Sequence, residues 1–322
     1  RVNAGADEVS YQYNCGDGVN RTFIFETSLP INEKNFPDDN FRNYIKTYKA
    51  GSRDVLTVEE RSKVETIEVE GKNISRLEGI EAFPNLKVLK CGNNSIQKLD
   101  LRQNPKLETL KCNENQLTQL DLSKNPDIDY LYCSENQLEQ LDVSHLQLKY
   151  LYCSHNDLEQ LDVKNSKLLI ELDCSKNNRL TALDLDVAHK PNLVRVECQN
   201  NQLTALDVSS SPDLTTLVLK NNHLTSLNLD NNPNLNFTIT DVYHSDFNNV
   251  YTVTLTPDRT FDLSALPGNF DKSRVTGWVN GTVKGNILTV NEGTKVVYYG
   301  YQCITGGIMD ASFTLDVAGT GG

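Results

Sequence analysis

A leucine-containing sequence pattern recurs about every 21 residues between Val64 and Leu235, and this repetition constrains the fold more than any other feature. One copy reads LETLKCNENQLTQLDLSKNP, from Leu107 to Pro126, and the next copy begins at Ile128 with IDYLYCSENQLEQLDVS. A fixed period of this length is typical of a solenoid, in which each copy forms one coil and buries its apolar side against its neighbours. The pattern predicts about eight coils over residues 64–243.

Each copy joins two extended stretches through turns. The LxxLxC stretch predicts a short strand whose fourth and sixth positions, such as Leu110 and Cys112, point inward, because side chains alternate along a strand. The LDL or LDV stretch has the same alternation, and the segments between the two stretches are too short for a helix. We therefore expect a parallel β-strand horseshoe with an extended convex side and little helix. An asparagine at the ninth position predicts a buried ladder of amides that bond to backbone groups in adjacent coils, formed by Asn94, Asn115, Asn136, Asn156, Asn177, Asn201 and Asn222.

Six of the eight cysteines occupy a single position of the repeat: Cys91, Cys112, Cys133, Cys153, Cys174 and Cys198. This column predicts a row of small buried apolar side chains, because a disulfide between equivalent side chains of parallel strands is strained. The sequence has no CxxC pair or interleaved histidine that indicates zinc. Cys15 and Cys303 lie outside the column, and they form a disulfide only if the two ends of the chain meet.

Different patterns flank the repeats. Residues 1–29 are irregular, with weak strand character at 21–25. Residues 30–63 predict a helical cap that covers the open end of the first coil. Its first helix follows Pro37, and Thr57 with Glu60 forms a capping-box pair that begins a second helix. The apolar residues at helical spacing in the first helix are Phe41, Tyr44, Ile45 and Tyr48.

The residues after the repeats alternate with a period of two. Residues 250–317 contain several short strand patterns separated by glycine and asparagine, which predicts a small all-β, Ig-like sandwich. Trp278, the single tryptophan, is expected in the core of this domain.

Composition excludes several classes of function. The net charge of −12 argues against a nucleic-acid partner, because an acidic surface repels phosphates. The apolar runs are too short for a membrane span. Because the chain begins with Arg1 rather than Met, we expect a processed chain from which a signal peptide has been removed. Since HExxH, GxSxG and glycine-rich phosphate loops are absent, we predict no catalytic residues, no metal and no cofactor.

The repeat LxxLxCxxNxLxxLDLSxNP resembles the bacterial leucine-rich repeats of surface and secreted proteins of gut and oral commensals. The helical segment FPDDNFRNYI, the repeats and the trailing β segment are together similar in layout to internalin-like adhesins, over about residues 31–317. This resemblance implies an extracellular, envelope-associated protein. Internalin-like proteins bind host cell-surface proteins on the concave face, a function that transfers to this chain only with matching contact residues. No contact residue of those adhesins has a match here. In some relatives the first segment resembles a calcium-binding loop, but residues 49–54 hold one carboxylate beside two cations, too few oxygen ligands for calcium.

Two outward-facing columns of the repeat bring aromatic side chains together. At the third and fifth positions, two adjacent strands carry Tyr130, Tyr132, Tyr150 and Tyr152. Lys111 lies on one side of this block, Asp173 on the other, and His155 borders it. Tyrosine combines a broad apolar ring with a hydroxyl, so the predicted ligand-binding residues are these four tyrosines with Lys111, His155 and Asp173. The alternative is that aromatic residues simply suit a half-exposed strand surface.

A column of aspartates on the second stretch of each copy has two explanations. Each carboxylate either accepts a backbone N–H in the following turn or contributes to a cation-binding stripe. The column consists of Asp100, Asp121, Asp142, Asp162, Asp184 and Asp207, closed by Asn228.

The sequence as a whole favours a non-enzymatic binding or adhesion module, secreted or on the cell surface, that recognises an extracellular protein or peptide. Two alternatives remain open: a glycan-binding surface protein that uses the same tyrosines, and a structural cell-envelope spacer without a specific ligand. The sequence leaves the oligomeric state open.

Overall fold

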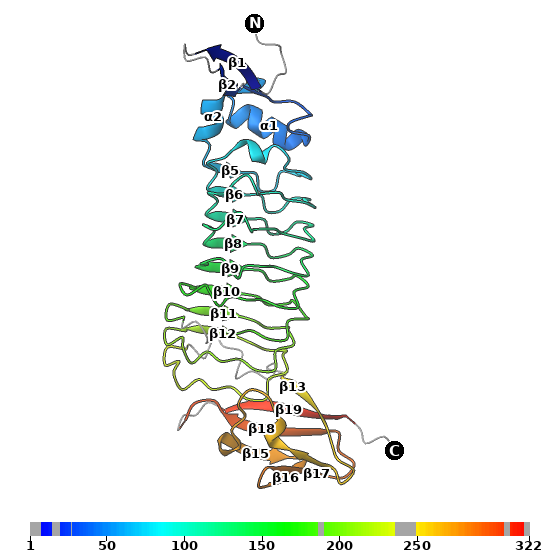
Figure 1. Ribbon diagram of the computed structural model, residues 1–322. Helices are drawn as coiled ribbons and strands as arrows, with labels where there is room; N and C mark the ends of the chain where they lie inside the picture. The colour runs from blue at the N-terminus through cyan, green and yellow to red at the C-terminus, as the bar shows by residue number, and fades with distance from the viewer. Residues whose placement is uncertain are drawn as a thin grey trace. The chain divides into compact units, whose positions relative to one another are not determined.

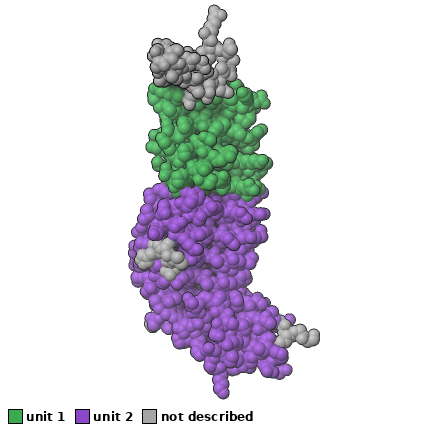
Figure 2. Space-filling model, in the orientation of Figure 1, with its two compact units in different colours: residues 1–128 green, residues 129–322 purple. Residues whose placement is uncertain are grey.

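A computed structural model describes residues 8–14, 20–26, 28–185, 190–235, 249–305 and 310–318. The chain divides into two compact units, residues 1–128 and residues 129–322, which Figure 2 shows in green and purple. Unit 1 contains two helices and the first repeats. Unit 2 contains the later repeats and a β domain (Figure 1).

Unit 1 begins with short strands. The antiparallel pair β1 (Glu8–Asn14) and β2 (Asn20–Glu26) occupies a segment for which the sequence predicted only weak strand character. A second antiparallel pair joins β3 (Leu29–Pro30) to β4 (Val55–Leu56) across the first helix.

The two predicted helices are present. Helix α1 (Asp39–Tyr48) begins after Asp38, whose carboxylate accepts the backbone N–H groups of Asn40 and Phe41. Helix α2 (Val58–Lys63) begins with the predicted capping box of Thr57 and Glu60. Phe41 and Ile45 are buried as expected, whereas Tyr48 is 67% exposed. Tyr48 is the last residue of α1, and its ring lies against Tyr44, with a centroid distance of 5.1 Å, rather than in the core.

Side chains of the helical segment bond to the first coil. The Tyr44 hydroxyl accepts the backbone N–H of Glu68 at 3.2 Å, and Lys49 Nζ donates to the carbonyl of Thr66 at 2.8 Å. Asp38 Oδ2 accepts the backbone N–H of Ser75 at 2.9 Å. The role of this segment as a cap stays a prediction, and these bonds show that it satisfies polar groups of strand β5 (Thr66–Glu68).

The repeats form parallel strands with little helix. In unit 1, β5 pairs with β6 (Val88–Lys90), and β6 pairs with β7 (Thr109–Lys111). A short 3₁₀ helix, η1 (Ile80–Ala82), lies between β5 and β6. In unit 2, the parallel strands are β8 (Tyr130–Tyr132), β9 (Tyr150–Tyr152), β10 (Glu171–Asp173), β11 (Arg195–Glu197) and β12 (Thr216–Val218). The predicted solenoid is therefore confirmed.

Burial follows the predicted alternation. Leu131 and Leu151, at the centres of β8 and β9, are fully buried, and their neighbours along each strand are half-buried. The six column cysteines are buried, and burial raises the pKa of Cys133 to about 12. The LDL and LDV stretches keep the alternation of buried leucine and exposed aspartate, but the described residues form no second ladder of strands there.

The asparagine ladder forms as predicted. Asn156, for example, is buried, and its Oδ1 accepts the backbone N–H of Leu138 at 3.0 Å. Its Nδ2 donates to the carbonyls of Cys133, Cys153 and Ser154. Asn156 thereby satisfies backbone groups of two coils, and Asn201 likewise donates to the carbonyls of Cys174 and Cys198. The buried Oδ1 of Asn201 has no hydrogen-bond partner among the described residues.

A second buried polar column was missed by the sequence analysis. The asparagines of the Asn-Pro dipeptides that end several copies of the repeat are buried and donate to carbonyls of the preceding coil, as Asn125 does to Leu101 and Asn104. In one coil this place is taken by Lys190, whose buried Nζ donates to the carbonyl of Val163 at 3.0 Å. Burial lowers the pKa of Lys190.

The chain ends in two small sheets. One has the order β13 (Val250–Thr254), β19 (Asp310–Ala318), β18 (Val296–Gln302), β15 (Val275–Val279), and the other β14 (Thr260–Asp262), β17 (Ile287–Val290), β16 (Gly281–Lys284). Strands β13 and β19 are parallel. Two short 3₁₀ helices complete the domain, η2 (Leu263–Ala265) and η3 (Lys272–Arg274). The Ig-like classification stays a prediction.

The β domain has an aromatic core. Tyr299, Tyr301 and Phe313 are buried, whereas Trp278 is only half-buried and lies 4.8 Å from the ring of Tyr299. Trp278 therefore lies at the margin of the core and not, as expected, within it. Cys303 is buried, and Cys15 lies outside the described residues, so the pairing between them that the sequence left open is not tested.

Candidate functional site

The four tyrosines of unit 2 form one aromatic cluster on the outward face of two adjacent strands. The parallel register places Tyr130 beside Tyr150 and Tyr132 beside Tyr152. The ring centroids of both pairs are 5.3 Å apart, and Tyr130 and Tyr152 are 6.0 Å apart. Because Leu131 and Leu151 occupy the alternate, inward positions, the backbone directs all four rings to this face, here called the strand face.

One tyrosine is fixed by a carboxylate on the next strand. The Tyr152 hydroxyl donates a hydrogen bond to Glu171 Oε2 at 2.7 Å. Partial burial and this bond to a negative group raise the pKa of Tyr152 well above its usual range. Burial also raises the pKa of Tyr130, with smaller contributions from Tyr132 and Glu171. Both phenols are therefore neutral at physiological pH and available as hydrogen-bonding groups.

Acidic side chains lie beside the cluster. In the register of β9 and β10, Glu171 is opposite Tyr150 and Asp173 is opposite Tyr152. Asp173 Oδ1 accepts the backbone N–H of Ser175 at 3.0 Å and its hydroxyl at 2.7 Å. On β11, Glu197 pairs with Arg195. The strand face of unit 2 thus changes from aromatic to acidic between β9 and β11.

Two other predicted site residues lie elsewhere. Lys111 is the half-buried last residue of β7 and belongs to unit 1, so the cluster of unit 2 does not include it. His155 is exposed in the turn that follows β9, where its φ of 52° is left-handed and its N–H donates to the carbonyl of Ser175. Whether either residue contacts a ligand stays a prediction. The structure does bring Asp173 next to the tyrosines, as the sequence predicted.

The aspartate column follows the first of its two explanations. Asp121, Asp142 and Asp207 each accept the backbone N–H of the residue two positions later, at 3.0, 3.0 and 2.8 Å. The backbone bond from Ser123 lowers the pKa of Asp121, and the hydroxyl and backbone N–H of Ser144 lower that of Asp142. The side-chain bond from Arg102 lowers the pKa of Asp100 to about 2. The carboxylates therefore stabilise turns in successive coils.

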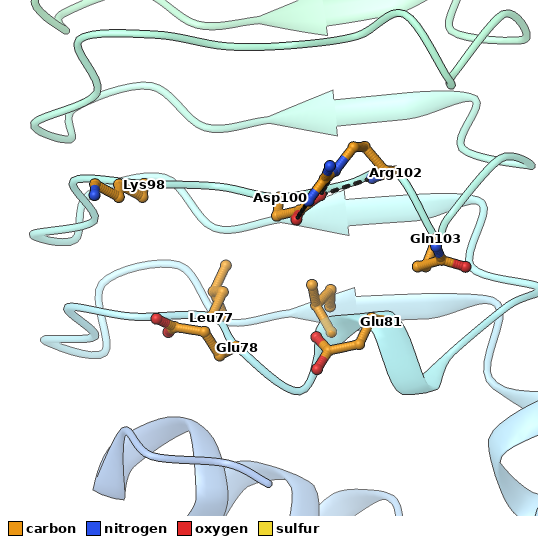
Figure 3. A pocket seen from close by; sticks show the side chains of 8 residues that line it. Leu77, Glu78, Glu81, Lys98, Asp100, Arg102 and Gln103 are labelled. Carbon is orange, nitrogen blue, oxygen red and sulfur yellow. Dashed lines mark hydrogen bonds and ion pairs between the residues drawn. The ribbon is translucent and has the colours of Figure 1, made fainter.

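Unit 1 contains a separate hollow of about 430 Å³ away from the strands. It lies between one coil segment with Glu78 and Glu81 and the next with Asp100 and Arg102 (Figure 3). Three of its charged groups are engaged locally, because Arg102 pairs with Asp100 and Glu81 accepts the backbone N–H of Gly79. The hollow is therefore a weaker candidate site than the aromatic cluster.

The described part of the chain holds no group of three or more histidine, cysteine, aspartate or glutamate side chains arranged to bind a metal ion. Within the same residues, no helix has both the length and the apolar character that a membrane crossing requires.

Comparison with known proteins reveals similarity in fold alone. No protein-family model matches the chain, and no curated protein matches it. Among solved structures, InlP of Listeria monocytogenes aligns with a TM-score of 0.54 and 22% identity, over 91% of this chain and 99% of that protein. A leucine-rich-repeat protein of Leptospira interrogans aligns with a TM-score of 0.50 and 22% identity, over 55% of this chain and 49% of that protein. The chain therefore has the fold of bacterial leucine-rich-repeat proteins.

Proposed function

We propose that this protein is a non-enzymatic, extracellular binding or adhesion module, secreted or at the cell surface, that recognises a protein or peptide on the strand face of unit 2. The observation that carries the proposal is the aromatic cluster, in which neighbouring rings lie 5.3 Å apart on two strands. Such a cluster offers a broad contact area with hydroxyls at its edge, and rigid rings lose little conformational entropy on binding.

The fold supports a binding role. A solenoid presents a long row of outward side chains on short, regular strands, so residues far apart in sequence act as one surface. The resemblance of the repeats to those of surface adhesins favours an extracellular location. Asp173 is proposed as a contact at the acidic side of the cluster, with His155 as a further contact.

The test is a binding screen of the intact protein against arrays of extracellular proteins and glycans. A variant with serine at Tyr130, Tyr132, Tyr150 and Tyr152 is compared with a control in which two exposed tyrosines outside the cluster, Tyr48 and Tyr298, are replaced by serine. Circular dichroism checks that both variants fold.

We expect a protein or peptide ligand whose binding is lost in the cluster variant and kept in the control. A glycan ligand with the same behaviour would support the glycan-binding alternative. Binding that survives in the cluster variant would place the site elsewhere, and an intact protein that binds nothing on either array would favour the spacer.

A further inference from the structure

The acidic side of the aromatic cluster indicates the chemistry of the partner. We infer that the strand face of unit 2 receives a basic segment of the partner, with an arginine guanidinium lying over Tyr150 and Tyr152 and against Glu171 and Asp173. This inference rests on the proposed function and narrows it to one class of ligand.

Negative charge is in excess at this place. The outward positions of β10 and β11 carry three carboxylates and one guanidinium, and that guanidinium, on Arg195, already pairs with Glu197. The remaining carboxylates, Glu171 and Asp173, are those nearest the rings in the strand register. A basic partner is complementary to this surface, whereas an acidic partner is repelled by it and by the whole chain, whose net charge is −12.

Each of these two carboxylates is held in place through one oxygen. Glu171 Oε2 accepts the Tyr152 hydroxyl, and Asp173 Oδ1 accepts two bonds from Ser175. Among the described residues, no hydrogen-bond donor contacts Glu171 Oε1 or Asp173 Oδ2. Side chains that are oriented before binding lose less entropy when a ligand arrives, so the two open oxygens form a prepared acceptor pair.

The neighbouring rings favour arginine in particular. A cation within about 6 Å of a tyrosine ring centre is attracted by the electron-rich face of the ring. Guanidinium is planar, so it can stack on a tyrosine ring while its N–H groups point outward, in the plane of the guanidinium, toward carboxylates. Tyr150 and Tyr152 lie directly opposite Glu171 and Asp173, so stacking and charge pairing are available at one place.

The test uses three nine-residue peptides in which glycine alternates with arginine, glutamine or glutamate, and calorimetric titration of the intact protein. We expect the arginine peptide to bind about tenfold more tightly than the glutamine peptide at low salt, with the difference shrinking as salt rises. The glutamate peptide is expected not to bind.

Two charge variants locate the effect. E171Q/D173N keeps the size and shape of both side chains and removes two charges from the strand face. The ratio of the affinity for the arginine peptide to that for the glutamine peptide should therefore fall to about one. The control E139Q/D157N removes two exposed charges elsewhere in unit 2 and should keep the preference. Equal loss in both variants would show only a general charge effect and would overturn the inference.

Failure of the inference and failure of the proposed function give different results. If the array ligand depends on the four tyrosines but is not basic, and E171Q/D173N binds it as well as the native protein, the proposed function stands and the basic partner is wrong. If the arginine peptide binds equally to the native protein and the four-serine variant, the stacking arrangement is wrong. If the native protein shows no preference for arginine over glutamine, the inference fails outright.

Discussion

The hydroxyl of Tyr152 donates a hydrogen bond to Glu171 Oε2, 2.7 Å away on the neighbouring strand. The bond runs diagonally, because Tyr152 lies opposite Asp173 in the strand register while Glu171 lies opposite Tyr150. It therefore links the two outward columns of the solenoid. The ring centroid of Tyr152 lies 6.0 Å from that of Tyr130 and 5.3 Å from that of Tyr132.

Replacing Glu171 by glutamine should lower the pKa of Tyr152 toward that of an ordinary tyrosine. Burial and the bond to a negatively charged acceptor both favour the neutral phenol, and the substitution removes the charge while leaving an amide oxygen in place. The titration is followed by NMR of ¹³C-labelled tyrosine side chains, with E139Q as the control. An unchanged titration of Tyr152 in E171Q would mean that the hydrogen bond does not persist in solution.

Alternate residues of one strand should respond differently to truncation. Leu151 is fully buried between the half-buried Tyr150 and Tyr152, so Leu151→Ala should reduce the free energy of unfolding by about 2–5 kcal/mol. Tyr150→Ala should cost less, because part of that side chain remains in water in the folded state. Urea denaturation followed by circular dichroism measures both, and a larger loss for Tyr150→Ala would contradict the observed orientation of the strand.

The solenoid was predictable because its periodicity is repeated many times along the chain. Most copies independently place leucine inward, asparagine at the turn and cysteine in the core, and side chains such as Leu131, Asn156 and Cys133 lie as the pattern predicts. The clustering of the four tyrosines followed from the same register, because residues at equivalent positions of adjacent coils become neighbours.

Features that depend on single contacts were not predictable. The Tyr152–Glu171 bond is diagonal, and column positions alone do not reveal which side chains on neighbouring strands form a hydrogen bond with each other. Tyr48 has helical spacing with Phe41, yet the helix ends at Tyr48 and leaves it exposed. Lys190 stands where other coils carry asparagine or serine, and only the folded chain reveals that its amine replaces the amide donor.

The stability of unit 1 should depend on pH through Asp38. Its carboxylate is buried, which raises its pKa. The backbone N–H groups of Ser75, Phe41 and Asn40 and the Ser75 hydroxyl outweigh burial, so the folded pKa lies below that of an ordinary aspartate. A depressed folded pKa means that this stabilisation is complete above about pH 4 and is lost as the pH falls through the folded pKa.

Two substitutions of Asp38 separate the stability that its side chain contributes as a helix cap from the stability that depends on its charge. Asp38→Ala should cost about 0.5–2 kcal/mol for the cap alone, and more if the bonds to Ser75 contribute. Asp38→Asn keeps an oxygen for the helix N-terminus but does not titrate, so its stability should vary less with pH than that of the native protein. Chemical denaturation between pH 3 and pH 7, over about the range in which carboxylates titrate, tests this expectation. Identical pH dependence in the native protein and the asparagine variant would rule out Asp38 as the source.

Arg274 should couple the last repeat to the β domain. Its guanidinium pairs with Asp230 of the repeats and donates to the Thr305 hydroxyl at 2.9 Å, while Asp230 Oδ1 accepts the Thr305 N–H at 2.6 Å. The bond from Arg274 is the largest influence on Asp230, whose pKa is lowered. Hydrogen bonds to charged groups contribute about 1.5–3 kcal/mol each, so Arg274→Met should destabilise this junction by an amount of that order.

The single tryptophan allows the junction to be followed directly. Trp278 lies in the β domain, so its fluorescence reports unfolding of that domain, while circular dichroism reports the whole chain. In the native protein the two signals should change together, and in Arg274→Met the fluorescence should change at lower urea concentration. Lys272→Met is the control, because the bonds of Lys272 to described residues lie within the β domain, to Gly285 and Asn286. If both substitutions shift the fluorescence transition equally, the effect of Arg274 lies within the β domain and not at its contact with the repeats.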